Sequence, residues 1–231
     1  MNKQDLVKRE MDRRTFIKVT GAVGLGLTAT SFGVPTLLSA APKTIKIGSV
    51  QPATGPLAVI GQGQRRGNQL AVDYINAKGG IKSMGGAKLE LLLGDSETKA
   101  TVGRSEADRL IKDGASVLIG AFQSGTGMAI ATLAEQRQIP FVMDVAALDV
   151  ITQKGYKYSF RIFPTVTTFG KTACKYIEQM IKERKVTPKR AVVTNTGDPF
   201  GKGQGGNFIK WFKKSGIPVE IVDHITYPLG I

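Results

Sequence analysis

Residues suited to catalysis are scarce in this chain. It has one histidine, His224, and one cysteine, Cys174. A metal site needs several converging ligands, and a nucleophilic cysteine needs a base beside it. One residue of each kind supplies neither arrangement. These counts argue against a metal site and against a Cys-His nucleophile pair. We expect a protein that is not an enzyme and that needs no cofactor. A single cysteine also excludes a disulfide within the chain.

Residues suited to binding a ligand lie in the loop Gly120–Gly127, GAFQSGTG, between an apolar run and a helical pattern. Ser124 and Thr126 are expected to cap the helix, whose first N–H groups favour a carboxylate or another anion. In an open α/β sheet, ligands bind outside the carboxyl ends of the strands. We therefore expect Ser124, Gly125 and Thr126 to contact a ligand. The alternative is a capping serine with no ligand role.

A second loop of this kind begins at Asp144, directly after the apolar run that starts at Pro140. Its carboxylate has two possible roles. It can bind the amine of a ligand, or it can cap a helix or turn.

The elements that must position these loops alternate between strand and helix, a pattern that predicts parallel sheets. Several expected strands are continuous apolar runs, as strands covered on both faces are. We expect strands at 44–50, 88–95, 115–122, 140–145, 158–163, 190–196 and 220–227. We expect helices at 63–77, 98–112, 125–138, 166–184 and 201–215.

The opening βα unit has a specific sequence pattern. A strand-like run is followed by a long loop, 51–63, which contains Thr54-Gly55-Pro56, and the next helix ends in INAKGGI at 75–81. In this order, these segments resemble the leucine/isoleucine/valine-binding protein family, the type I periplasmic solute receptors of ABC transporters.

This resemblance implies an α/β fold of the type I periplasmic-binding-protein kind, with two doubly wound parallel-sheet lobes that close on a small solute. The first lobe is expected at 42–160 and the second at 161–231. The resemblance covers 44–231 but only the front half of a family member. We therefore expect a truncated chain or a fragment, and a complete single-lobe protein is the minority alternative.

The resemblance also names ligand residues. Ser124 matches the serine that holds the ligand carboxylate, together with neighbouring amides. Val145 and Ala147 stand where amino-acid receptors place an Ala and a Thr, so the hydroxyl is lost at Ala147. Phe200 matches an aromatic residue that stacks on the ligand, with a hydrophobic staple as the alternative. Ile60 occupies a position that is often aromatic. The acidic partner of a ligand ammonium group would lie beyond the present sequence.

The N-terminal segment predicts export. Arg13-Arg14 with Phe16 and Lys18 resembles the twin-arginine consensus, and a weakly apolar stretch follows. Residues 1–41 are therefore expected to be a signal peptide, which directs the protein to the periplasm through the twin-arginine machinery. The expected partners are a small-molecule ligand and ABC permease subunits.

The formal net charge of +14 does not indicate nucleic acid, because the basic residues are scattered and form no long run. They are expected to make a solvated surface.

The leading expectation is thus a periplasmic binding protein for a branched-chain amino acid or a related small metabolite. One alternative is a dinucleotide-dependent oxidoreductase, since Gly61, Gly63 and Gly67 are spaced somewhat like a dinucleotide fingerprint and Asp95 ends the next strand. That fingerprint needs a tight turn directly after the strand. Another alternative is a truncated receptor without function.

Overall fold

The computed structural model describes residues 44–185 and 188–229, so the expected signal peptide lies outside the described residues. The described residues form two separate parallel sheets, and we call the parts built on them the first and second lobes, a division into domains that stays a prediction. The first sheet has the order β2-β1-β3-β4-β5. Its strands are β1 (Ile45–Gln51), β2 (Leu89–Asp95), β3 (Val117–Gly120), β4 (Phe141–Met143) and β5 (Ser159–Arg161).

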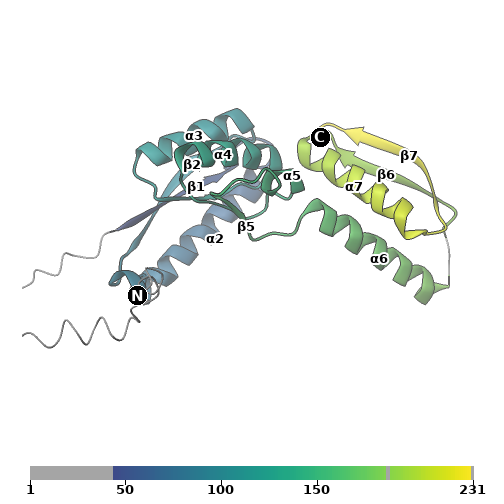
Figure 1. Cartoon of the computed structure of the whole chain (residues 1–231), viewed down its shortest axis with the longest axis horizontal. Helices are drawn as coiled ribbons and strands as arrows, with labels where there is room; N and C mark the ends of the chain where they lie inside the picture. Colours follow the sequence, from purple (N-terminus) through teal and green to yellow (C-terminus); the bar gives the residue numbers. More distant parts are fainter. Residues whose placement is uncertain (1–43, 186–187, 230–231) are drawn as a thin grey trace, which may run out of the picture. The chain divides into compact units, whose positions relative to one another are not determined.

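Helices cover both faces of this sheet, because parallel neighbours must be joined by crossover segments. Helices α3 (Ala100–Lys112) and α4 (Ser124–Arg137) lie side by side on one face, and α2 (Ala58–Ala77) lies on the other (Figure 1). A 3-10 turn, η1 (Lys82–Met84), and a short helix, α5 (Asp149–Thr152), complete the lobe.

The core of the first lobe lies where the sheet meets α3 and α4. It includes Leu110 on α3, Leu118 on β3, Ile130 on α4 and Phe141 on β4, all with no exposed surface. These side chains belong to four different elements, so their burial fixes the positions of the helices relative to the strand ends.

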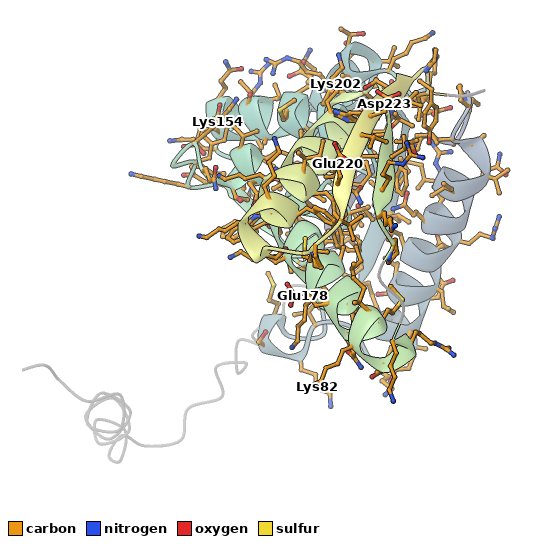
Figure 2. The ribbon with its side chains drawn as sticks, turned by 90° about the vertical axis from the view of Figure 1, so that its right-hand side faces the viewer. Lys82, Lys154, Glu178, Lys202, Glu220 and Asp223 are labelled. Atoms are coloured by element: carbon orange, nitrogen blue, oxygen red, sulfur yellow. The ribbon has the colours of Figure 1, made fainter. Side chains whose placement is uncertain are left out.

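The second lobe consists of α6 (Val166–Arg184), β6 (Arg190–Thr196), α7 (Pro199–Ser215) and β7 (Glu220–Tyr227). β6 and β7 form a parallel pair, α7 packs on β6, and α6 packs on α7. The buried core of this lobe is small and contains Cys174, Phe212 and Ile217. Glu220 and Asp223 are exposed on β7 (Figure 2), and charges of this kind discourage pairing with further strands.

All seven expected strands are present in the expected order. The expected loop 51–63 is too long, because α2 begins at Ala58 rather than at Gly63. Gly61 explains this difference. A Cβ atom there would lie 2.0 Å from the backbone oxygen of Pro52, so only glycine lets the first turn of α2 approach the end of β1.

No helix in the described ranges is long and apolar enough to cross a membrane.

Candidate ligand-binding site

The helices that follow β1, β2 and β3 share one property at their N-termini. α2, α3 and α4 begin without a side-chain cap and without an acidic residue in their first turn. In contrast, Thr165 caps α6 and Asp198 caps α7. The first N–H groups of a helix have no partner inside it. Positive helix ends therefore gather at the carboxyl edge of the first sheet, where an anion would be stabilised, although the Ala58 N–H at the start of α2 already donates to the Gly55 carbonyl.

Ser124 is buried at the start of α4 and has 1% of its surface exposed. The expectation that Ser124 or Thr126 caps this helix is wrong, because the N-cap position is Gln123 and no side chain caps it. Instead, the Ser124 hydroxyl oxygen accepts hydrogen bonds from the backbone N–H groups of Ala147, at 3.1 Å, and Leu148, at 3.3 Å. The structure thus brings Ser124 and Ala147 together, and the Ser124 hydroxyl proton is left to donate.

The loop after β4 is fixed from several sides. Ala147 is 1% exposed, and its carbonyl accepts from the N–H of Val166 at 2.9 Å. In this conformation, Ala147 presents neither its side chain nor its N–H group to a ligand. Val145 is half-buried in the same loop. Ligand contact by these two residues stays a prediction.

Thr126 and Gly125 differ in what they present. The Thr126 side chain is 1% exposed and packs against α3, where its Cγ2 would lie 2.4 Å from a Cβ at Gly103. Gly125 is half-buried, and a Cβ there would lie 3.5 Å from Cγ of Pro199, the first residue of α7. Gly125 therefore lies where α4 meets the start of α7.

Phe200 and Ile60 are placed in separate surroundings. Phe200 follows the start of α7 and lines a cavity of about 440 Å³ in the second lobe, which Phe169, Asn195 and Tyr227 also line. Ile60 lies in the first turn of α2 and is 43% exposed. Neither residue is in contact with Ser124 in any interaction that the structure records, so their common role in a site stays a prediction.

Asp95 anchors the loop that contains Thr54-Gly55-Pro56. Its carboxylate accepts from the N–H groups of Ala53, Thr54 and Glu97 and from the Thr54 hydroxyl. Burial raises the pKa of Asp95, but these hydrogen bonds together outweigh it, so the pKa lies below its usual value. From the sequence, Asp95 was expected only as the acid of a dinucleotide fingerprint. Its actual role is to tie the end of β2 to the loop after β1.

Gln51 and Asp144 form a pair that sequence reasoning missed. The Gln51 side-chain amide donates to the Asp144 carboxyl at 2.5 Å, a contact that neither expected role of Asp144 included, and the roles of cleft acid and cap stay predictions. Gln51 has no exposed surface. A buried Gln at the end of β1 and an Asp at the end of β4 were the available signal, but their pairing depends on the strand order.

The arrangement does not match the dinucleotide alternative. Gly61 and Gly67 lie inside α2 rather than in a turn between β1 and α2. As a separate point, the part of the chain that the structure describes contains no group of three or more His, Cys, Asp or Glu residues that could hold a metal. Cys174 is buried in the second lobe.

A family model described as "Periplasmic binding protein" matches residues 44–231. The chain belongs to this family. The match confirms the resemblance found in the opening βα unit and the expected fold class, a type I periplasmic binding fold of which the chain forms a part.

Curated relatives in the family are named as leucine/isoleucine/valine-binding proteins. The protein BraC3 of Rhizobium johnstonii is 30% identical over 200 residues, which cover 87% of this chain and 52% of that protein. Homolog 8 of Brucella suis is 34% identical over 173 residues, which cover 74% of this chain and 39% of that protein. The chain thus spans about half the length, or less, of these relatives.

Solved structures of substrate-binding proteins are also similar to this chain. The substrate-binding protein LivJ of Streptococcus pneumoniae, in complex with isoleucine, matches with a TM-score of 0.68 and 28% identity over 82% of this chain and 51% of LivJ. A solute-binding protein from R. palustris, in complex with benzoate, matches with a TM-score of 0.68 and 27% identity over 81% of this chain and 49% of that protein.

Proposed function

We propose that this chain is part of the substrate-binding component of an ABC importer and that it captures a small carboxylate. A branched-chain amino acid and an aromatic acid share this group, and relatives of the family are described in complex with isoleucine and with benzoate. In this proposal the two lobes close on the ligand, which stabilises the closed state by its additional contacts. The protein binds its ligand and passes it to permease subunits without changing it.

The observation that carries the proposal is the uncapped N-terminus of α4 beside the Ser124 hydroxyl. The N–H groups of the first turn and the hydroxyl proton of Ser124 are donors, and the helix end is positive. A carboxylate at this point replaces the missing cap. Val145 and Phe200 would then supply apolar contacts, and Ile60 would give a different wall from the aromatic one that is common in the family.

Periplasmic location is part of the proposal and agrees with the family's description. Export by the twin-arginine route rests on Arg13-Arg14 in a segment outside the described residues.

The test is calorimetric titration with L-isoleucine, L-leucine and benzoate, with isoleucinamide and benzamide as matched ligands that lack the carboxylate. We expect at least one acid to bind and its amide not to bind. If none of the acids binds and none raises the melting temperature, the alternative of a truncated receptor without function is supported instead.

Gly125→Asp sharpens the test. An aspartate in the first turn of α4 suits the helix end, so the fold is retained, but its charge repels a ligand carboxylate. We expect the affinity to fall by about tenfold or more, which corresponds to about 1.4 kcal/mol. Gly125→Asn is the neutral control of the same size, and we expect it to change the affinity much less. Equal losses in both variants would mean that no carboxylate lies there.

A further inference from the structure

Gln51 and Asp144 lie at the carboxyl ends of β1 and β4, and β3 runs between these two strands. The Gln51 amide therefore spans the end of β3 to donate to Asp144 Oδ2 at 2.5 Å. Gly120, the last residue of β3, is required at this point by the backbone of β1 rather than by the Gln51 side chain. A Cβ atom at Gly120 would lie 2.3 Å from the backbone oxygen of Val50 and 3.5 Å from Gln51 Nε2.

Two oxygens of this pair are buried and have no hydrogen-bond partner among the described residues: Gln51 Oε1 and Asp144 Oδ1. An ionised carboxylate only accepts hydrogen bonds, and one primary amide supplies donors from its nitrogen alone. The ionised pair therefore leaves both oxygens without a donor, and a buried polar atom without a partner destabilises the fold.

A neutral carboxylic acid removes this mismatch, because it has one O–H donor and one C=O acceptor, as a primary amide has one N–H side and one C=O side. We propose that Asp144 is retained as the neutral acid, with its O–H donating to Gln51 Oε1 while the Gln51 amide donates to Asp144, and that this pair positions the loop after β4.

The surroundings agree with a neutral acid. Burial raises the pKa of Asp144, and the Gln51 amide and the nearby backbone N–H groups of Asp144 and Val145 oppose that effect only in part. The charged side chains of neighbouring elements are engaged elsewhere. Arg161 of β5 donates to two backbone carbonyls and to a threonine hydroxyl, Asp149 of α5 accepts from a threonine, and Asp95 of β2 holds the loop after β1.

The position of Asp144 gives the pair its role. The Asp144 N–H donates to the carbonyl of Gly120 at 3.0 Å, and the Ala146 N–H donates to the carbonyl of Ala121 at 3.0 Å. The next residue, Ala147, meets the Ser124 hydroxyl. The Gln51–Asp144 pair thus connects the end of β1 to the loop after β4, and this loop contacts α4 through Ala147 and Ser124. This positioning role for the ligand site rests on the proposed function, whereas the pairing itself does not.

Asp144→Asn is the decisive variant, because a second amide can form the same two hydrogen bonds with Gln51 without a proton to lose. The infrared difference spectrum between the wild-type chain and this variant at pH 7 is expected to contain the C=O band of a protonated carboxyl group. A carboxylate band in its place would overturn the proposal. Asp108→Asn on α3 is the matched control and is expected to show the carboxylate band, because hydrogen bonds from Lys112 and Arg137 lower the pKa of Asp108.

The pH dependence of stability is the second readout. A raised pKa in the folded state stabilises the fold below the unfolded pKa, about 3.9, and this contribution is lost as the pH rises through the folded pKa. The wild type should therefore be at most as stable as Asp144→Asn, and any difference should grow with pH in favour of the variant. Asp144→Leu, which removes both hydrogen bonds, should be less stable than Asp144→Asn.

If Asp144→Asn is less stable than the wild type by the same amount from pH 5 to pH 8.5, the proposal is wrong. Neither measurement needs a ligand, so a failure of the proposed function in calorimetry leaves this result interpretable.

Discussion

The Ser124 hydroxyl oxygen lies 3.1 Å from the backbone nitrogen of Ala147, although 22 residues separate the two in the sequence. This single side chain joins the first turn of α4 to the loop after β4. Ser124, which is expected to bind a ligand, therefore also stabilises the fold, so its replacement should affect stability and binding together.

Ser124→Ala should lower the free energy of unfolding of the first lobe by about 1–3 kcal/mol, because two backbone N–H groups lose their acceptor in a buried place. Urea denaturation followed by circular dichroism measures the change. Ser116→Ala, at an exposed position just before β3, is the control and should shift the midpoint very little. A variant at Ser124 as stable as this control would contradict the structural role.

Gly61 and Gly67 lie in the same helix, but alanine should have opposite effects at the two positions. At Gly61, a Cβ would meet the Pro52 backbone at 2.0 Å, so we expect Gly61→Ala to destabilise by about 3 kcal/mol or more. At exposed Gly67, a Cβ would have no atom within 4 Å apart from its chain neighbours and the backbone of its own helix, so Gly67→Ala should stabilise by about 0.5–1 kcal/mol. Thermal melts of both variants test this, and a shift of equal sign would refute it.

Asp95→Asn should make the first lobe less stable at neutral pH and less sensitive to acid. The pKa of Asp95 is lowered in the folded state, so its stabilisation is present above the unfolded pKa of about 3.9 and is lost as the pH falls through the folded pKa. Replacement by a neutral amide weakens hydrogen bonds to a charged group and should cost about 2 kcal/mol at pH 7.

The measurement is the urea midpoint of unfolding of the wild type and of Asp95→Asn at several pH values between 2.5 and 7. The wild type should lose stability more steeply on the acid side than Asp95→Asn does. Parallel curves for the two proteins would mean that Asp95 does not hold the loop in its ionised form.

The sequence was sufficient for the strands because their apolar runs are local signals. β6 and β7 occupy the expected 190–196 and 220–227. It was insufficient for the start of α2, because the fit of Gly61 against Pro52 is a contact between elements. A strand was expected at 158–163, but no local signal could show that β5 pairs with β4 and so belongs to the first sheet.

The candidate site was predictable only in part. The loop at Ser124 was found because it combines a strand end, glycines and hydroxyls. The Gln51–Asp144 pair was not found, because two residues 93 positions apart meet only once the order of β1, β3 and β4 is known. Ser124 was expected as the cap because its side chain suits that role, but the Ser124 hydroxyl bonds to the loop after β4 and the N-cap position falls on Gln123, whose side chain makes no capping bond.

The uneven cores of the two lobes have a consequence for any melting experiment. The first lobe buries a continuous cluster across β1, β3, β4, α3 and α4, whereas the second buries Cys174, Phe212 and Ile217. Cooperative units with fewer buried contacts open at lower free energy. Amide hydrogens of β6 and β7 should exchange with deuterium before those of β3. Thermal unfolding would then show two transitions, the second lobe unfolding first. A ligand bound by the first lobe alone would raise the melting temperature of the later transition and leave that of the earlier one unchanged.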